Sequence, residues 1–515
     1  MIKLLRKNWF ALAVLSILVL YVFTHLWRLL ELPVFADESI YIRWAQLIID
    51  DWREYLFFPM NDGKTPLFIW MMVPFQFIFS DQLFAGRFVS VVIGLGQIVA
   101  TMWVAKLFGG KRVSMVLAGL FIAITPFWFF HHRMALIDAT LAFFLTLTIG
   151  LAIQSFKNKR KLSILVAGAI YGLAFWTKIP ALLFAPAIAL LAFLPAKKTH
   201  LERFWLLVTT GAVVILGGLF FVLLKTQPSF SQLFSRGNDF LYPVSDVLFH
   251  GFYKNTLPNI PVYLGYFWAY LTPAILVLML LGLFIRKTRR TTLILILSAL
   301  GFFLPIAILG KSVYPRYFLP VAIPLTIGAS LVLEKLINFA KAKRFSLKKR
   351  LIAALAVGVL TANVVTSSAS FIFPALTNSN MIPFVEPDIV QYLTEWSSGH
   401  GISETVSLIQ EQARHQSVAV ATEGYFGTLP DAILMYLHRR DVSNISVQGV
   451  GQPIRGISPE FIKFSKNYDS AWLVVNSHRM LMDTEKISLV DEFCRPLNGP
   501  CLQVWDISSL RDAKP

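Results

Sequence analysis

Two sparse acidic sites stand out in a chain that is otherwise strongly apolar. Asp37 and Glu38 follow the first hydrophobic segment, and Asp138 is the only acidic residue between Gln82 and Leu201. An ionisable group at membrane depth is costly, so such groups are usually functional or paired. A carboxylate can accept a proton from a nucleophile, which makes these three acids candidate catalytic residues.

The composition predicts a membrane protein with many spans. Of the 515 residues, 56% are hydrophobic and only 15% are charged, and the mean hydropathy is +0.63. The net charge of +18 does not indicate a nucleic-acid partner, because it is confined to one part of the chain. Residues 1–374 contain 36 Lys and Arg against 13 acids, whereas residues 375–515 contain 11 against 16.

A membrane-spanning helix needs about 20 largely apolar residues, and about eleven segments qualify. The first has no small-residue cleavage site after it, so we expect it to be retained. The predicted spans are Trp9–Leu30, Phe88–Leu107, Val113–Phe130, Ala139–Phe156, Leu162–Trp176, Ile179–Leu194, Phe204–Leu224, Tyr263–Ile285, Thr291–Gly310, Tyr317–Leu333 and Leu351–Phe371.

Charge decides the predicted orientation and the status of Pro66–Phe79, which is apolar but short. If Pro66–Phe79 does not span, the basic clusters near residues 3–7, 111–112, 157–161, 197–198, 286–290 and 341–350 share one side. That side then holds 24 Lys and Arg with two acids, which marks it as cytoplasmic. We therefore predict a cytoplasmic N-terminus, an external C-terminus and a re-entrant or interfacial helix at Pro66–Phe79.

This topology brings the candidate acids and five cations to the outer face. Sugar transfer from a polyprenyl-phosphate donor would use both groups. A carboxylate would take the proton of the acceptor, and cations would hold the leaving lipid phosphate. A single displacement at the anomeric carbon would invert its configuration. The sequence has no Gly-rich phosphate loop and no Asp-x-Asp metal motif. The five cations that this topology brings to the outer face are Lys64, Arg87, Arg133, Lys178 and Arg316.

The composition changes after the last span, and residues 375–515 are predicted to form a small external α/β domain. Four β-rich runs alternate with segments of mixed helical character such as Asp431–Leu437. The only cysteines, Cys494 and Cys501, lie here, and either a disulfide or two free thiols is compatible with the sequence. The runs are Val418–Ala421, Ile445–Val447, Trp472–Val475 and Leu502–Trp505.

Residues 1–180 resemble integral-membrane, polyprenyl-phosphate-dependent glycosyltransferases of the C-type fold, including protein O-mannosyltransferases and lipid A aminoarabinose transferases. The resemblance rests on Asp37-Glu38, on residues 64–67 (KTPL), on residues 86–90 (GRFVS) and on residues 133–138. Residues 314–317 (YPRY) resemble a later loop motif, and members often have two prolines where this chain has Thr65-Pro66. The resemblance implies that Asp37 is the base, that Asp138 is a second acidic site, and that Lys64 and Arg316 lie near the donor phosphate.

Each candidate also has an ordinary structural interpretation. Asp37 and Glu38 could be loop charges, and Asp138 could neutralise Arg133 while favouring the start of its helix. Lys64 and Arg87 could be interfacial anchors, and Lys178 could be a hairpin charge. His131 and His132 could bind a metal with Asp138 only if further ligands joined them. No cofactor is certain. A divalent cation at the carboxylates is an alternative, although we expect transfer to survive chelation.

Three other function classes compete with glycosyl transfer to a lipid, glycan or protein acceptor. Secondary transporters also have many spans, but they favour polar residues near the midplane and repeated halves. A polymerase or ligase of lipid-linked glycans would share the donor and differ in the acceptor. A structural or signalling membrane protein would use the external domain as a sensor.

Overall fold

The computed structural model describes residues 2–158, 160–194, 199–438 and 443–511. The chain divides into two compact units. The first contains residues 1–27, 56–68 and 88–377, and the second contains residues 28–55, 69–87 and 378–515. The predicted domain boundary at 374/375 stays a prediction. Lys159, Lys197 and Lys198, which belong to predicted cytoplasmic clusters, lie outside the described residues.

The first unit is helical, and seven helices in the described part of the chain are long and apolar enough to cross a membrane, or eight if one bent pair counts as a span. These helices make the chain a multi-pass membrane protein. Its helices are α1 (Ile2–Leu26), α6 (Gln82–Leu107, beginning in the second unit), α7 (Arg112–Ile124), α8 (Pro126–His131), α9 (Ile137–Asn158), α10 (Lys161–Thr177), α11 (Ala185–Leu190), α12 (His200–Val222), α13 (Gly237–Phe240), α14 (Val244–Phe249), α15 (Tyr253–Thr256), α16 (Ile260–Tyr270), α17 (Pro273–Phe284), α18 (Arg289–Leu309), α19 (Leu319–Lys341) and α20 (Leu347–Thr377).

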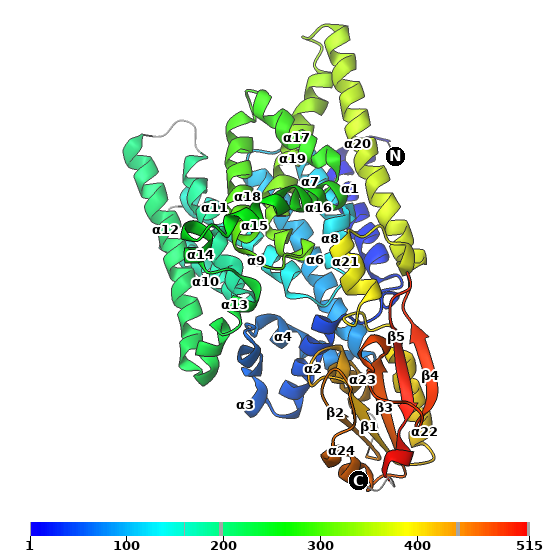
Figure 1. Cartoon of the computed structure of the whole chain (residues 1–515). Coiled ribbons are helices and arrows are strands. Elements are labelled where there is room, and N and C mark those ends of the chain that lie inside the picture. Colours follow the sequence, from blue (N-terminus) through cyan, green and yellow to red (C-terminus); the bar gives the residue numbers. More distant parts are fainter. Residues whose placement is uncertain (1, 159, 195–198, 439–442, 512–515) are drawn as a thin grey trace. The chain divides into compact units, whose positions relative to one another are not determined.

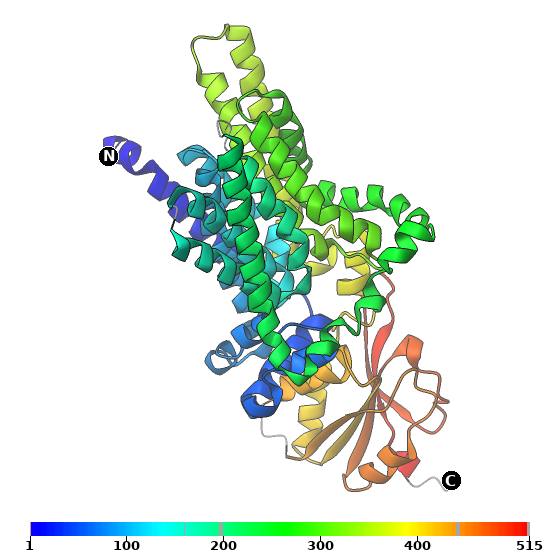
Figure 2. The same ribbon diagram turned by 90° about the vertical axis from the view of Figure 1, so that its left-hand side faces the viewer.

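Burial separates a central helix from peripheral ones. In the span that contains α19, 94% of the most apolar 18-residue stretch is buried. In the corresponding stretches of α12 and α20 only 17% is buried. A helix that is apolar all round and buried belongs in a protein core, and one that is apolar and exposed fits a lipid-facing position. Helices α9, α10 and α12 lie side by side (Figures 1 and 2).

One predicted span is corrected. Tyr263–Ile285 is not a single straight helix, because α16 and α17 meet at an angle of 106°. Thr272 has φ 74° between them, and Pro273 begins α17. Since proline disfavours helical geometry in the residue before it, the Thr272-Pro273 pair explains the break. Of the other predicted spans, those at 113–130, 162–176 and 179–194 coincide with shorter apolar helices.

The predicted re-entrant segment Pro66–Phe79 consists of two short helices, α4 (Leu67–Met72) and α5 (Phe75–Ile78), separated at Val73-Pro74. It ranks among the shorter apolar helices rather than the candidate spans. Proline removes an N–H and clashes with the preceding turn, so Pro74 limits the length of α4. Helix α4 begins in the first unit and ends in the second.

The second unit contains a five-stranded mixed sheet with the order β2-β1-β3-β5-β4 (Figure 1). Strands β2, β1 and β3 are parallel, and β5 and β4 are antiparallel additions. The strands are β1 (Val418–Thr422), β2 (Ile445–Gly449), β3 (Ser470–Asn476), β4 (Ser488–Cys494) and β5 (Cys501–Asp506). The helices are α2 (Ala36–Asp50), α3 (Trp52–Tyr55), α5, α21 (Glu386–Ile389), α22 (Ile402–Ala413), α23 (Ile433–Leu437) and α24 (Pro459–Ser465).

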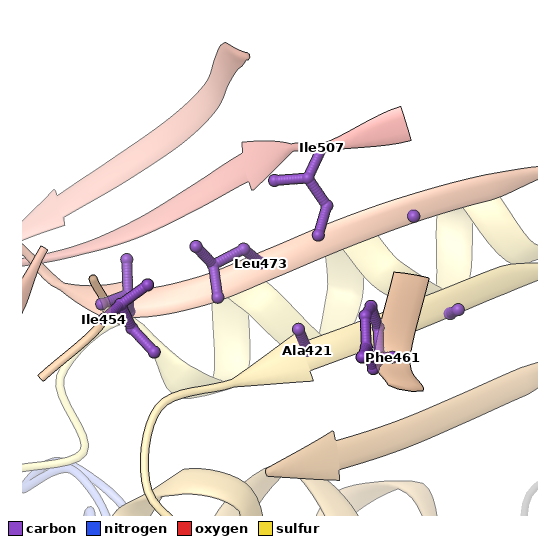
Figure 3. Packing of buried hydrophobic residues seen from close by; sticks show 8 residues of the cluster. Ala421, Ile454, Phe461, Leu473 and Ile507 are labelled. Atoms are coloured by element: carbon purple, nitrogen blue, oxygen red, sulfur yellow. The ribbon is translucent and has the colours of Figure 1, made fainter. Parts of the chain in front are cut away.

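The prediction of a small α/β fold for the C-terminal residues is confirmed, including the four β-rich runs. Strands β1 and β3 are buried along their whole length, as expected of inner strands. Ala421, Leu473 and Ile507 pack against Phe461 of α24 and against Ile454 (Figure 3). The predicted alternative of a disulfide is also confirmed, since Cys494 and Cys501 are bonded. This bond joins β4, an exposed strand that the sequence did not predict, to β5.

Candidate active site

Asp37 lies in the first turn of α2, and it is the only residue between Val34 and Ile42 that is not buried. Helix α2 is therefore packed on nearly every side at its start, with one carboxylate left accessible. Such a side chain sits on a rigid backbone and can still meet a ligand. This is the geometry that a catalytic carboxylate requires.

Glu38 and Arg87 form a buried ion pair next to Asp37. Their side chains are 0% and 1% exposed. Arg87 Nε donates to Glu38 Oε1 at 2.8 Å, and Arg87 Nη2 donates to Glu38 Oε2 at 2.7 Å. Glu38 Oε2 also accepts from the N–H of Phe35 at 3.0 Å, which satisfies a free donor at the start of α2.

The other donors of Arg87 bind the loop that precedes α2. Nη1 donates to the carbonyls of Leu29 and Leu32, each at 2.8 Å, and Nη2 donates to the carbonyl of Pro33 at 3.0 Å. A guanidinium has five N–H groups, and these contacts engage all of them. Arg87 therefore joins the loop to Glu38 and has no donor left for a phosphate.

Two backbone hydrogen bonds to residues far along the chain also hold this loop. The sequence did not predict these residues. The N–H of Ala36 donates to the carbonyl of Ser397 at 2.9 Å, and the N–H of Gly399 donates to the carbonyl of Val34 at 2.7 Å. Residues 397–399 contain no motif, so no sequence signal could have found them. They hold the backbone immediately before Asp37 within the second unit.

Asp138, Lys178 and Arg316 form one cluster in the first unit. Lys178 Nζ donates to Asp138 Oδ1 at 2.7 Å and lies 4.5 Å from the centre of the Tyr317 ring. The guanidinium of Arg316 lies 5.5 Å from the same ring and 5.3 Å from that of Tyr314. Asp138 is 2% exposed and Arg316 is 6% exposed. The cluster therefore holds two cations and one acid around an aromatic ring.

His131 is a buried histidine that is close in the sequence to Asp138 of this cluster. Its ring is buried, Nδ1 is 2.7 Å from the carbonyl of Phe127, and Nε2 has no hydrogen-bond partner in the described structure. His131 ends α8, and Asp138 lies in the first turn of α9, the next helix in the chain. A buried nitrogen without a partner beside paired charges is a place where a polar ligand atom could bind.

The side chain of Arg133 binds the C-terminal end of α1. Its Nη1 donates to the carbonyls of Thr24, His25 and Trp27 at 2.6, 3.1 and 3.0 Å. The last carbonyls of a helix lack partners within the helix, and a cation there is favourable. The ion pair of Asp138 is with Lys178, and Asp138 lies in the first turn of α9, where a negative charge is favourable.

Lys64 lies in a second basic group of the first unit. Its Nζ is 5.7 Å from the centre of the Phe240 ring, and the guanidinium of Arg236 is 5.5 Å from it. Arg236 also pairs with Asp62 at 2.5 Å, and Lys311 Nζ donates to the carbonyl of Asn238. Arg236 was not predicted as a site residue, although it belongs to the long predicted loop at residues 225–262, between the predicted spans at 204–224 and 263–285.

The candidate carboxylates do not belong to a metal-binding group among the described residues. The one group with suitable spacing there is Glu492 with Cys494 and Cys501, and both sulfurs are used in the disulfide. Asp37 and Glu38 belong to the second unit, whereas Asp138 belongs to the first.

Solved structures provide the decisive comparison for the fold. ArnT from Cupriavidus metallidurans in the apo state matches with a TM-score of 0.60 and 17% identity, over 99% of this chain and 100% of that one. Its undecaprenyl phosphate complex matches with a TM-score of 0.58 and 17% identity, over 99% of each chain. The chain has the C-type glycosyltransferase fold. The resemblance predicted from the sequence is thereby confirmed at the level of the fold.

Other comparisons agree with the C-type fold. AglB from Archaeoglobus fulgidus, in complex with an inhibitory peptide and a dolichol-phosphate, matches with a TM-score of 0.55 and 11% identity, over 92% of this chain and 70% of that one. The sequence profile of the family described as dolichyl-phosphate-mannose-protein mannosyltransferase matches residues 63–222. No curated protein sequence is significantly similar to the chain. The matched range includes Lys64 through Lys178 of the candidate residues, but not Asp37, Glu38 or Arg316.

Proposed function

We propose that the chain is an inverting glycosyltransferase that uses a polyprenyl-phosphate-sugar donor and a cell-envelope or protein acceptor at the outer face of the membrane. The observation that carries the proposal is that Asp37 alone is accessible in the buried segment from Val34 to Ile42. This segment is held by the Glu38–Arg87 pair and by backbone hydrogen bonds to residues 397 and 399. The C-type fold supports it, as do the lipid phosphates in the ArnT and AglB structures.

Asp37 is assigned as the base in this mechanism. The acceptor hydroxyl or amide attacks the anomeric carbon of the donor, and Asp37 takes the proton that the nucleophile loses. The bond between the anomeric carbon and the phosphate oxygen breaks, and the polyprenyl phosphate leaves with the electron pair. Attack opposite the leaving group inverts the anomeric carbon. No cofactor enters this scheme.

The remaining candidates divide into three roles. Lys64 and Arg316 are assigned to the donor phosphate, with Lys178 and Asp138 setting the charge beside Arg316. Glu38 and Arg87 are assigned as positioning residues for Asp37, because their polar atoms bind each other and the adjacent backbone. Arg133 is assigned to the end of α1.

Neutralising a phosphate ligand is expected to weaken lipid-phosphate binding. Undecaprenyl phosphate alone serves as the probe, so the test does not require the sugar to be known. A charge-assisted hydrogen bond contributes about 1.5–3 kcal/mol, so Arg316→Gln or Lys64→Gln should raise the dissociation constant about tenfold or more. Arg316→Lys should lose less, since it keeps the charge and loses the planar fork.

The control is Lys254→Gln, which removes an exposed lysine from the 225–262 loop. It should bind the lipid phosphate like the unmodified protein. Equal affinities in all four variants, with unchanged melting temperatures, would reduce Lys64 and Arg316 to structural anchors. In that case the donor site must be sought elsewhere in the chain.

Orientation is tested by reporter fusions. We expect a reporter at Lys287 to be cytoplasmic and one placed after Pro374 to be extracytoplasmic, because positive loops are retained on the cytoplasmic side. Paired alkaline phosphatase and fluorescent protein fusions would measure both positions. A cytoplasmic signal after Pro374 would contradict the proposed orientation and the outer location of the reaction.

A further inference from the structure

The parallel strands of the second unit end together at one edge of the sheet. β1 lies between β2 and β3, so the chain leaves β1 on one side for β2 and returns on the other side for β3. The loops after these strands meet at that edge, where the N–H of Gly424 donates to the carbonyl of Gly451 at 2.8 Å. In open α/β sheets, ligands bind outside the carboxyl ends of the strands where the strand order reverses.

A polar network occupies the centre of this edge. Glu423, which follows β1 directly, accepts at Oε2 from the Asn476 N–H at 2.9 Å and at Oε1 from Arg479 Nη1 at 3.1 Å. The same Arg479 nitrogen donates to Gln452 Oε1 at 2.6 Å. The charges of Glu423 and Arg479 cancel each other. The network thus offers planar polar groups with no net charge.

One atom of the network has no partner within the described structure. Asn476 is 1% exposed, and its Nδ2 donates to Glu423 Oε1. Its Oδ1 has no hydrogen-bond donor near it. Buried polar atoms are nearly always satisfied, so an unpaired acceptor at a sheet edge points to a donor supplied from outside the chain.

Three exposed aromatic residues lie next to members of the network, one against Arg479 and two in the loop that follows Glu423. Tyr425 is 74% exposed, Phe426 is 44% exposed and Trp396 is 36% exposed. The guanidinium of Arg479 lies 4.7 Å from the centre of the Trp396 ring. A Cβ built on Gly427 would lie 3.2 Å from the Trp396 ring. Exposed large apolar side chains that gather in one place mark a binding surface.

This surface contacts the segment that carries Asp37. The rings of Phe426 and Trp44 of α2 stack with centres 6.0 Å apart. Ser39 Oγ, which donates to the carbonyl of Ala36 at 2.8 Å, lies 3.4 Å from the carbonyl of Gly427. Trp396 directly precedes the residues that bind the backbone before Asp37. A ligand held by the surface would therefore be held on the same compact unit as the proposed base.

We propose that this aromatic edge, formed by Trp396, Tyr425, Phe426, Gln452 and Arg479, binds a saccharide portion of the acceptor. A sugar ring has an apolar face of C–H groups and a rim of hydroxyls, which match aromatic faces beside uncharged or paired planar polar groups. The proposal rests on the proposed glycosyl transfer and specifies its acceptor.

Binding of saccharides by the full chain tests the proposal without requiring transfer. The detergent-solubilised protein, without donor, is applied to an array of defined oligosaccharides and to an array of synthetic peptides. We expect saccharide binding, and we expect Tyr425→Ala and Trp396→Ala to weaken it about tenfold, because a bound saccharide would cover each ring and make it an aromatic anchor. Trp52→Ala removes a 61% exposed tryptophan of the same unit and should leave the binding unchanged.

Asp37→Asn separates this inference from the proposed reaction. It should lose transfer and keep saccharide binding, whereas Tyr425→Ala should keep its affinity for undecaprenyl phosphate. Equal saccharide binding by all variants, no saccharide binding at all, or binding of peptides alone would overturn the assignment of the edge to a saccharide. These outcomes would leave the role of Asp37 to be judged by its own transfer assay.

Discussion

Replacing Asp37 by asparagine is expected to lower the rate of sugar transfer about 10²–10⁴-fold, the usual loss on removing a general base. The substitution keeps the shape of the side chain and removes its ability to take a proton. The surrounding helix should be unaffected, because its neighbours are held by Glu38, Arg87 and the 397–399 backbone. The measurement is transfer of radiolabelled sugar from lipid-linked donors in membranes that contain each variant.

The matched control is Asp51→Asn, which alters an exposed carboxylate at the other end of the same helix. Asp51 Oδ1 accepts from the Arg53 N–H, and an asparagine oxygen can do the same. This variant should transfer sugar at the normal rate. If a well-folded Asp37→Asn protein also transfers normally, Asp37 is not the base. Glycan and lipid mass spectrometry of a deletion strain would identify the acceptor independently.

Removing the Arg87 charge is expected to destabilise the protein by about 3–5 kcal/mol, since Glu38 would be left as a buried charge without its partner. Arg87→Met retains much of the side-chain volume and removes every donor. Thermal unfolding in detergent measures the effect. Transfer should fall as well, because Leu29, Leu32 and Pro33 lose the contacts that fix the loop before Asp37.

Two further variants make this prediction specific. Arg28→Met breaks a neighbouring ion pair with Glu31 whose side chains are 41% and 25% exposed. An exposed pair contributes only about 0–1 kcal/mol, so this variant should unfold almost normally. The double variant Glu38→Gln with Arg87→Met should recover stability, because neither charge is then buried alone. Equal melting temperatures for Arg87→Met and Arg28→Met would contradict the structural role of Arg87.

The sequence alone determined features that depend on local composition. Long apolar runs must become helices in a membrane, because each backbone group has to find its partner within its own segment. The four short β-rich runs similarly predicted β1, β2, β3 and β5. The rarity of acids in an apolar chain singled out Asp37, Glu38 and Asp138 for the same local reason. The exposed strand β4 was missed because it carries Asp491 and Glu492 and lacks a buried face.

Only the tertiary structure decided what each charged residue does. Arg87 and Lys178 read alike as cations near a membrane surface, yet Arg87 is enclosed by backbone carbonyls and Lys178 is partly exposed beside Asp138. Their partners lie 49 and 40 residues away in the sequence, so no local pattern encodes the pairing. The aromatic edge likewise joins residues from 396 to 479, and it exists because parallel strands separated along the chain end side by side. Burial and long-range packing, rather than residue type, separate a charge that holds the fold from one that can meet a substrate.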